Sequence, residues 1–282
     1  MFIPSFMGFD KAGFGPPLLL DTYPGAAAAY SVRKLRTAYT GSAIRVRRTD
    51  LTEANIGFTS AGNLDTTALL AFTGTGASDN GFITTWYDQS GNAKNATQTT
   101  ALNQPQIVSS GSVITDNGKP NLFFNGSTSF LLTASSVIST DFSIYSVAKT
   151  PSSGTSRTGF VLSQYAINDP NRTYFAITRP TDLTIGVQIG STLSFSLTNQ
   201  NFVQQLYYWN RNNSSIDIAV NNASVTTDTN GTTAQNSGLG FGGFQAGARS
   251  LLNIQEAVIY TSSQSSNRTG ISTNINTYYG IY

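Results

Sequence analysis

Short alternations of apolar and polar residues dominate the chain from about residue 105 to residue 260. Examples are FLLTAS (130–135), DFSIYSVAKT (141–150), QQLYYWNR (204–211) and LNIQEAVIY (252–260). A two-residue period is typical of β-strands, and segments rich in Gly, Asn and Ser separate these runs as turns. Many short strands with few helices predict an all-β fold, an antiparallel β-sandwich of the jelly-roll type.

Three segments carry helical signals instead. GAAAAYSVRKLRTAY (25–39) follows Pro24 and is rich in alanine, which favours a helix. LDTTALLAF (64–72) places Asp65 where a helix N-cap is expected. The segment 265–282 has apolar residues at helical spacing, namely Ile271, Ile275 and Tyr278 or Tyr279. We therefore expect a few short helices beside the strands.

The first 20 residues follow neither period and form a predicted N-terminal arm. Its phenylalanines are separated by Gly and Pro, and they are Phe2, Phe6, Phe9 and Phe14. Exposed aromatic side chains require a partner surface, so the arm is expected to anchor the protein to a neighbouring subunit. The alternative is that they pack on their own domain. Residues 21–282 show no repeat or linker and are expected to form one domain.

Composition narrows the functional classes. Charged residues make up 11% of the 282 residues, and the net charge is +2, which gives no global attraction to nucleic acid. One basic stretch stands out, consisting of Arg33, Lys34, Arg36, Arg45, Arg47 and Arg48. It forms either two solvated faces or a patch for an anionic partner. The start lacks the basic region of a signal peptide, and no segment reaches the length of a membrane span.

The chain contains no cysteine and no histidine. Their absence excludes disulfides, thiol catalysis, Ser-His-Asp catalysis, and metal sites built on Cys or His. Catalysis would have to use carboxylates, Tyr or Lys. No spaced run of acidic residues resembles a calcium loop, so we expect neither a metal nor another cofactor.

The segment GFITTWYDQSGN (81–92) is the first candidate binding site. Trp86 or Tyr87 could stack on a sugar ring while Asp88 and Asn92 hydrogen-bond its hydroxyls. The alternative is structural: consecutive strand residues point to opposite faces, and an aspartate at a strand end often accepts hydrogen bonds from backbone N–H groups of a turn.

Three runs make the chain resemble a known family. They are PGAAAAYSVRKLRTAYTGSAIRVRR, IGFTSAGNLDTTALLAF and GFITTWYDQSGNAKNATQTTALNQPQIV, within residues 24–126. This part resembles the catalytic domain of α-L-arabinofuranosidase B, glycoside hydrolase family 54. NIQEAVIYTSS and the final helix resemble the closing elements of concanavalin A-like, laminin-G-like sandwiches. The N-terminal block is also similar to parts of bacteriophage structural proteins. The resemblance implies a concanavalin A-like β-sandwich.

The family resemblance also implies a candidate catalytic residue. Family members are retaining enzymes with a glutamate nucleophile on a late strand, and Glu256 matches it best. Their acid/base is an aspartate further along the chain, but no Asp or Glu follows Glu256 here. Retaining hydrolysis needs two carboxyl groups about 5 Å apart, and general acid catalysis is worth ~10²–10⁴-fold. Asp88, Asp217 or Asp228 could substitute in space; alternatively, Glu256 is a structural hydrogen-bonding residue.

These observations favour a non-catalytic bacteriophage virion protein, such as a capsid decoration, spike, head fibre or tail fibre. It would be made in the host cytoplasm and assembled into the particle through the arm. We expect a homo-oligomer that contacts other virion proteins and displays a jelly roll able to hold glycans. The first alternative is a retaining arabinofuranosidase-like glycoside hydrolase with Glu256 as nucleophile. The second is a secreted carbohydrate-binding module.

Overall fold

The computed structural model describes most of the chain. The described residues are 17–150, 160–164, 173–176, 184–189, 192–198, 203–229, 238–245 and 248–282. The expected arm, residues 1–20, lies outside this set except for its last four residues, so Phe2, Phe6, Phe9 and Phe14 are not described. Leu19 and Leu20 belong to helix α1 (Leu19–Thr22) and are buried in the core.

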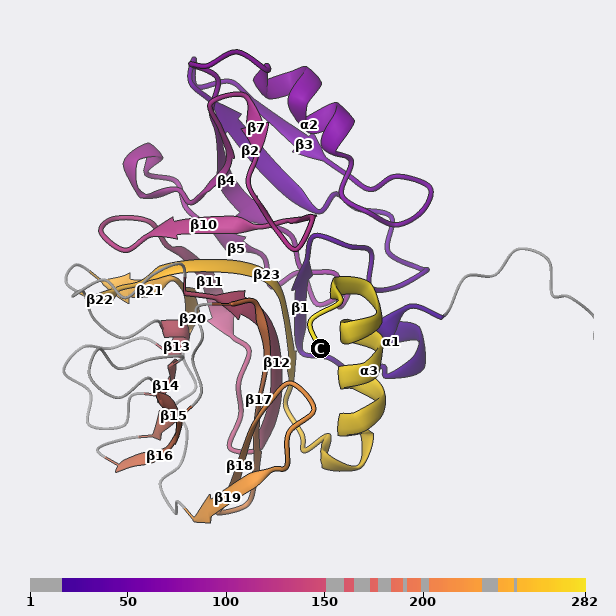
Figure 1. The fold of residues 1–282 in the computed structure, drawn as a ribbon, viewed down its shortest axis with the longest axis vertical. Helices are drawn as coiled ribbons and strands as arrows, with labels where there is room; N and C mark the ends of the chain where they lie inside the picture. Colours follow the sequence, from indigo (N-terminus) through magenta and orange to yellow (C-terminus); the bar gives the residue numbers. More distant parts are fainter. Residues whose placement is uncertain are drawn as a thin grey trace, which may run out of the picture.

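The described residues form two packed antiparallel sheets beside a smaller lobe (Figure 1). In the first sheet β23 pairs with β12, and the order continues through β17 and β18 to β19. The two halves of β23 pair on its other side with β1 and β10. These strands are β1 (Ala28–Ser31), β10 (Leu122–Asn125), β12 (Phe142–Lys149), β17 (Gln205–Asn212), β18 (Ser215–Val220), β19 (Thr226–Thr229) and β23 (Leu251–Tyr260).

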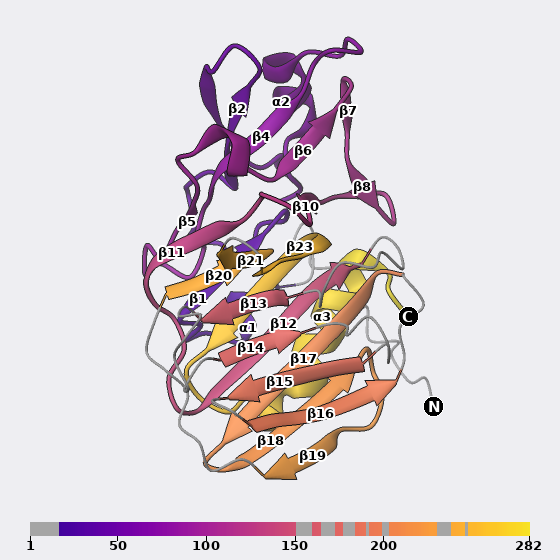
Figure 2. The same cartoon turned by 90° about the vertical axis from the view of Figure 1, so that its left-hand side faces the viewer.

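The second sheet lies across the first, as Figure 2 shows. Its order is β5, β11, β20, β13, β14, β15 and β16. The bounds are β5 (Ala96–Thr97), β11 (Leu131–Ser136), β13 (Phe160–Gln164), β14 (Thr173–Ala176), β15 (Thr184–Ile189), β16 (Thr192–Thr198) and β20 (Gly238–Phe241).

The lobe joins both sheets, because β4 pairs with β5 of the second sheet and β6 pairs with β10 of the first. Its elements are β2 (Ile44–Arg48), β3 (Glu53–Ile56), α2 (Thr66–Thr73), β4 (Gly81–Trp86), β6 (Gln106–Ser109) and β7 (Ser112–Val113). The remaining elements are 3-10 turns at Ala101–Asn103 and Ser265–Asn267, hairpins β8 (Thr115–Asp116)/β9 (Lys119–Pro120) and β21 (Gly243–Gln245)/β22 (Ala248–Arg249), and α3 (Arg268–Tyr279).

The central strands are covered on both faces. Between the sheets, the Phe175 ring lies 5.2 Å from that of Phe142 and 5.7 Å from that of Trp209, measured between ring centroids. On the opposite face Tyr208 lies under the guanidinium of Arg268, at the start of α3. The expected β-sandwich is therefore confirmed, with helices α1 and α3 forming an extra layer outside the first sheet (Figure 1).

Two of the three predicted helices are confirmed. The Asp65 carboxylate accepts a hydrogen bond from the Ala68 backbone N–H at 2.9 Å and caps α2, and α3 ends at Gly280 in the left-handed region. The helix predicted over 25–39 is wrong, because this segment contains β1, paired with β23 and fully buried. Burial against a neighbouring strand outweighs the helix preference of alanine, which is a weak effect.

No helix in the described part of the chain combines the length and apolar character that a membrane-spanning helix requires.

Candidate functional site

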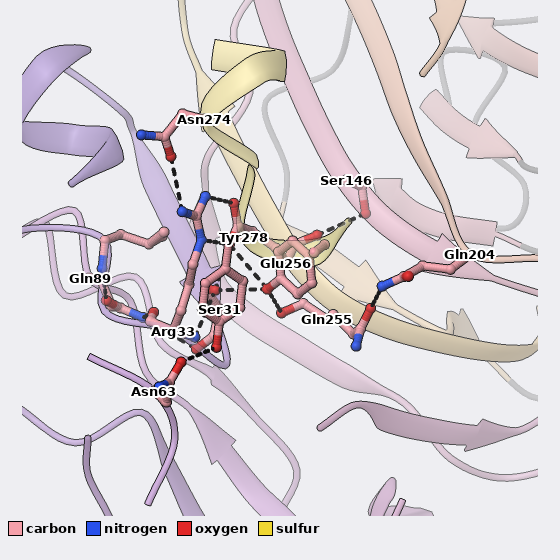
Figure 3. A network of polar contacts seen from close by, with 12 residues as sticks. Ser31, Arg33, Asn63, Gln89, Ser146, Gln204, Gln255, Glu256, Asn274 and Tyr278 are labelled. Atoms are coloured by element: carbon pink, nitrogen blue, oxygen red, sulfur yellow. Dashed lines mark hydrogen bonds and ion pairs between the residues drawn. The ribbon is translucent and has the colours of Figure 1, made fainter. Parts of the chain in front are cut away.

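Glu256 lies in the middle of β23, with its side chain facing α3 and 0% exposed. Arg33 binds it through two hydrogen bonds, Nε to Oε2 at 2.8 Å and Nη2 to Oε1 at 2.9 Å. The hydroxyl of Ser31 donates to Oε2 at 2.6 Å, and the hydroxyl of Tyr279 lies 3.2 Å from the same oxygen. Figure 3 shows this network at close range.

Strand pairing places these groups together. In the register of β1 and β23, Ser31 lies opposite Glu256. Arg33 follows two residues later and reaches the same carboxylate, as the two-residue period of an extended chain requires. The pairing of β12 with β23 skips Gln255, which therefore forms a β-bulge next to Glu256.

The electrostatics of the site favour the charged form of Arg33 and the neutral form of Tyr279. Burial acts to lower the pKa of the Arg33 guanidinium, but the charge of Glu256 and its hydrogen bonds outweigh burial, so this pKa is raised. Burial and the Glu256 charge together hold the pKa of Tyr279 well above its ordinary value. The Arg33 guanidinium also lies 5.1 Å from the ring centre of Tyr278 and donates from Nη1 to Asn274 Oδ1 at 2.9 Å.

A nucleophilic carboxylate must reach the anomeric carbon of a sugar. Glu256 has no exposed surface, and both of its oxygens accept hydrogen bonds from Arg33. Within the described residues, no carboxyl group contacts Glu256. Its contacts are those of an ion pair in the protein core.

The three aspartates considered as catalytic partners lie elsewhere. Asp217 is on β18, three strands from β23, or about 14 Å at the usual strand spacing. Asp228 lies one strand further, on β19. Asp88 lies in the turn after β4, where it makes other contacts. In the described part of the chain the Glu256 carboxylate is hydrogen-bonded by Ser31, Arg33 and Tyr279, and by none of these three aspartates.

Trp86 is the last residue of β4 and Tyr87 follows it, and their side chains point to opposite sides. The Trp86 ring is fully buried, 5.6 Å from the ring of Tyr30 and 5.3 Å from that of Phe241. The Tyr87 side chain is partly exposed, and its hydroxyl donates to Asn55 Oδ1 at 2.9 Å. A sugar on this surface would therefore meet Tyr87 and not Trp86.

Asp88 and Asn92 connect the turn after β4 to β1 and the residues before it. Oδ1 of Asp88 accepts hydrogen bonds from the backbone N–H groups of Ala29 and Ser90 at 2.8 and 2.9 Å, and Oδ2 accepts one from the N–H of Lys94 at 3.0 Å. The Asn92 amide donates to the carbonyl of Ala26 at 3.0 Å. Sugar binding by these residues stays a prediction.

A cavity of about 970 Å³ lies between α1, α3 and the segment after β1, at the outer end of the Arg33 network. Its polar groups are largely bonded to one another: Asp21 accepts from the Thr37 hydroxyl at 2.5 Å, and Asn274 bonds to Arg33. Sequence reasoning missed this cavity, because its walls come from opposite ends of the chain. The residues lining it include Pro17, Tyr23, Arg33, Lys34, Gly270 and Tyr278.

Comparison with known proteins supports the fold. No family model and no curated protein matches the chain. An arabinofuranosidase complexed with arabinofuranosyl-α-1,2-xylobiose has a similar structure, with a TM-score of 0.69 and 15% identity over 91% of this chain and 64% of that one. A mutant GH54 α-L-arabinofuranosidase soaked with 4-nitrophenyl α-L-arabinofuranoside gives a TM-score of 0.72 at the same identity and coverage.

The chain spans less than two thirds of the length of these two structures. At 15% identity the similarity shows the fold alone, a β-sandwich like those of these two structures. Neither an enzymatic activity nor a place in a virus particle follows from this similarity.

Proposed function

We propose that the protein is a non-catalytic, displayed β-sandwich of a bacteriophage particle, serving as a capsid decoration, spike, head fibre or tail fibre. The observation that carries the non-catalytic part is the burial of Glu256 in its ion pair with Arg33. Freeing Glu256 to attack a sugar would leave Arg33 buried without its partner, a cost of ~3–5 kcal/mol for a buried pair. That cost would add to the barrier of any reaction at this carboxylate.

The particle context rests on the sequence. Residues 24–126 resemble a block found in bacteriophage structural proteins, and the low charge suits a surface packed into a large assembly. The phenylalanines of residues 1–20 are proposed to contact another virion protein, and copies of the chain are proposed to associate. The protein would then be located in the virion.

An activity assay tests the non-catalytic proposal. The purified chain is expected to release no more nitrophenol from 4-nitrophenyl α-L-arabinofuranoside than a buffer blank, while a GH54 enzyme in parallel does. Glu256→Gln is expected to alter stability and not turnover. Turnover by the unmodified chain that a folded Glu256→Gln variant lacks would establish the glycoside hydrolase alternative.

A deletion tests the anchoring proposal. Removing residues 1–16 spares Leu19 and Leu20, which are buried in the core, so the shortened protein is expected to fold. It is also expected to be absent from purified particles, whereas the full chain is incorporated. A second variant keeps the full length of the chain and tests the aromatic side chains alone, by replacing Phe2, Phe6, Phe9 and Phe14 with serine. Incorporation of both variants at the normal level would refute anchoring by the arm.

Glycan binding is proposed at the end of β4, where Tyr87 and Asn92 reach the surface. On a glycan array, Tyr87→Ala is expected to lose the signals that the unmodified protein gives. Tyr282→Ala serves as the control, because Tyr282 is also exposed, at 47%, but belongs to the C-terminal segment. Equal signals from both variants would place any glycan site elsewhere.

A further inference from the structure

Asp116, in the hairpin β8/β9, connects two strands of the first sheet through one buried carboxylate. The Lys149 ammonium donates to Oδ1 at 2.7 Å, and the side-chain amide of Asn253 donates to Oδ2 at 2.6 Å. The amide of Asn121 donates to Oδ2 at 2.9 Å. A carboxylate therefore contacts an amine and a primary amide at the same time.

The strand register brings the amine and the amide close together. Lys149 at the end of β12 is the direct partner of Asn253 on β23, and directly opposed side chains of an antiparallel pair have Cβ atoms about 4.5–5.5 Å apart. Oδ1 of Asn253 is buried and has no hydrogen-bond partner among the described residues. The Lys149 side chain is 29% exposed, which leaves a small leaving group a path to solvent.

We propose that Lys149 and Asn253 become joined by an intramolecular isopeptide bond, with Asp116 as the proton carrier. Asp116 takes a proton from the Lys149 ammonium, and the free Nζ attacks Cγ of Asn253. The Nζ–Cγ bond forms and the Cγ–Nδ2 bond breaks. Of the two protons that Nζ loses, one leaves on Nδ2 as ammonia and the other passes through Asp116 to solvent. The step consumes no oxidant or reductant.

Two general effects favour this reaction. Holding amine and amide in one folded structure replaces a bimolecular encounter by an intramolecular one, which is a large rate advantage. A positioned carboxylate then supplies general acid–base catalysis. The product would enclose β13 to β22 in a covalent loop, the kind of cross-link that stabilises by restricting the unfolded chain. A chain without cysteine has no disulfide to serve that purpose.

Intact mass of the purified full-length chain, measured under denaturing conditions, tests the proposal. It is expected to fall below the mass of the sequence by one ammonia molecule, and a protease digest is expected to contain a branched peptide joining Lys149 to Asn253. A mass equal to that of the sequence would overturn the proposal. Loss of one water, with a branch between Lys149 and Asp116, would also overturn it, because the electrophile would be the carboxylate.

Substitutions separate the cross-link from other losses of ammonia. Lys149→Arg keeps the charge facing Asp116 but cannot form the bond, so its mass is expected to equal that of its sequence. A cyclic imide at Asn253 would also lose ammonia, but it would persist in Lys149→Arg and overturn the proposal. Asp116→Ala is expected to abolish the loss by removing the proton carrier. The matched control is Lys119→Arg, on β9 of the same hairpin, which is expected to keep it.

Discussion

Glu256 and Asp88 are both buried carboxylates beside β1, yet they are held in different ways. The partners of Glu256 are side chains, above all the charged Arg33, which lies far from it in the sequence. Asp88 is bonded mainly by backbone N–H groups, two of them from its own turn. Glu256 is thus half of an ion pair, whereas Asp88 stabilises a turn by accepting hydrogen bonds from its backbone.

The difference predicts different responses to substitution. A buried ion pair stabilises little by itself, since desolvation offsets its attraction, but removing one partner leaves an uncompensated charge. Removing a carboxylate that accepts hydrogen bonds from backbone N–H groups leaves neutral donors unsatisfied, which costs ~1–3 kcal/mol and therefore less than an uncompensated charge. Variants at the two sites therefore test whether the two carboxylates differ in this way.

The largest expected effect belongs to Arg33→Met. Methionine keeps much of the side-chain volume but leaves Glu256 buried without its counter-charge, so the free energy of unfolding is expected to fall by ~3–5 kcal/mol. Urea unfolding monitored by tryptophan fluorescence measures it, since Trp86 and Trp209 are both buried.

The control for this prediction replaces both partners. The double variant Arg33→Met with Glu256→Leu removes the whole pair, and its stability is expected to lie within about 1 kcal/mol of the unmodified protein. Strong non-additivity is expected for residues in contact. If the losses of stability measured for Arg33→Met and for Glu256→Leu alone simply add in the double variant, the description of Glu256 as half of an ion pair is wrong.

A smaller loss is expected at the other carboxylate. Asp88→Ala removes the acceptor for the N–H groups of Ala29, Ser90 and Lys94, and we expect a loss of ~2 kcal/mol, within the range for unsatisfied buried donors. The measurement is again the free energy of unfolding in urea.

Asp88→Asn is the matched control, because it keeps one acceptor oxygen for Ala29 and Ser90 and adds a donor facing Lys94. About half of the loss at Asp88→Ala is expected. A loss at Asp88→Asn as large as that of Arg33→Met would mean that the negative charge is essential here too, and the contrast between the two sites would disappear.

The same contrast explains what the sequence could predict. For Asp88, one alternative is that its carboxylate accepts hydrogen bonds from the backbone of a turn. This role depends on residues close to it in the sequence, so the local sequence is enough to suggest it. The partner of Glu256 depends on the register of β1 and β23, and the segment of β1 has the composition of a helix. Without that pairing, Arg33 cannot be assigned to Glu256. The cavity between α1 and α3 was unpredictable for the same reason, whereas the alternating strands and α2 with its Asp65 cap required only local patterns.

The last expected effect concerns alkaline pH, to which buried tyrosines beside both carboxylates are sensitive: burial and the Asp88 charge raise the pKa of Tyr30 as burial and the Glu256 charge raise that of Tyr279. Burial and the Glu256 charge hold the pKa of Tyr279 well above its ordinary value, and burial raises that of Tyr278 to about 12. The unfolded chain loses these protons near pH ~10, so above that pH it binds fewer protons than the folded chain, and stability falls by up to ~1.4 kcal/mol per pH unit for each tyrosine.

The contribution of these two tyrosines to the free energy of unfolding is therefore expected to be complete below pH ~10 and to decline above it. For Tyr278 the decline is expected to level off near pH 12, where the folded protein also loses this proton. Tyr279→Phe is expected to make this decline shallower in urea unfolding series between pH 8 and 11. Tyr282→Phe should change the slope less, because its side chain is about half exposed. An unchanged slope in Tyr279→Phe would show that this hydroxyl is not held protonated beside Glu256, because a group with equal proton affinity in both states contributes nothing to the pH dependence.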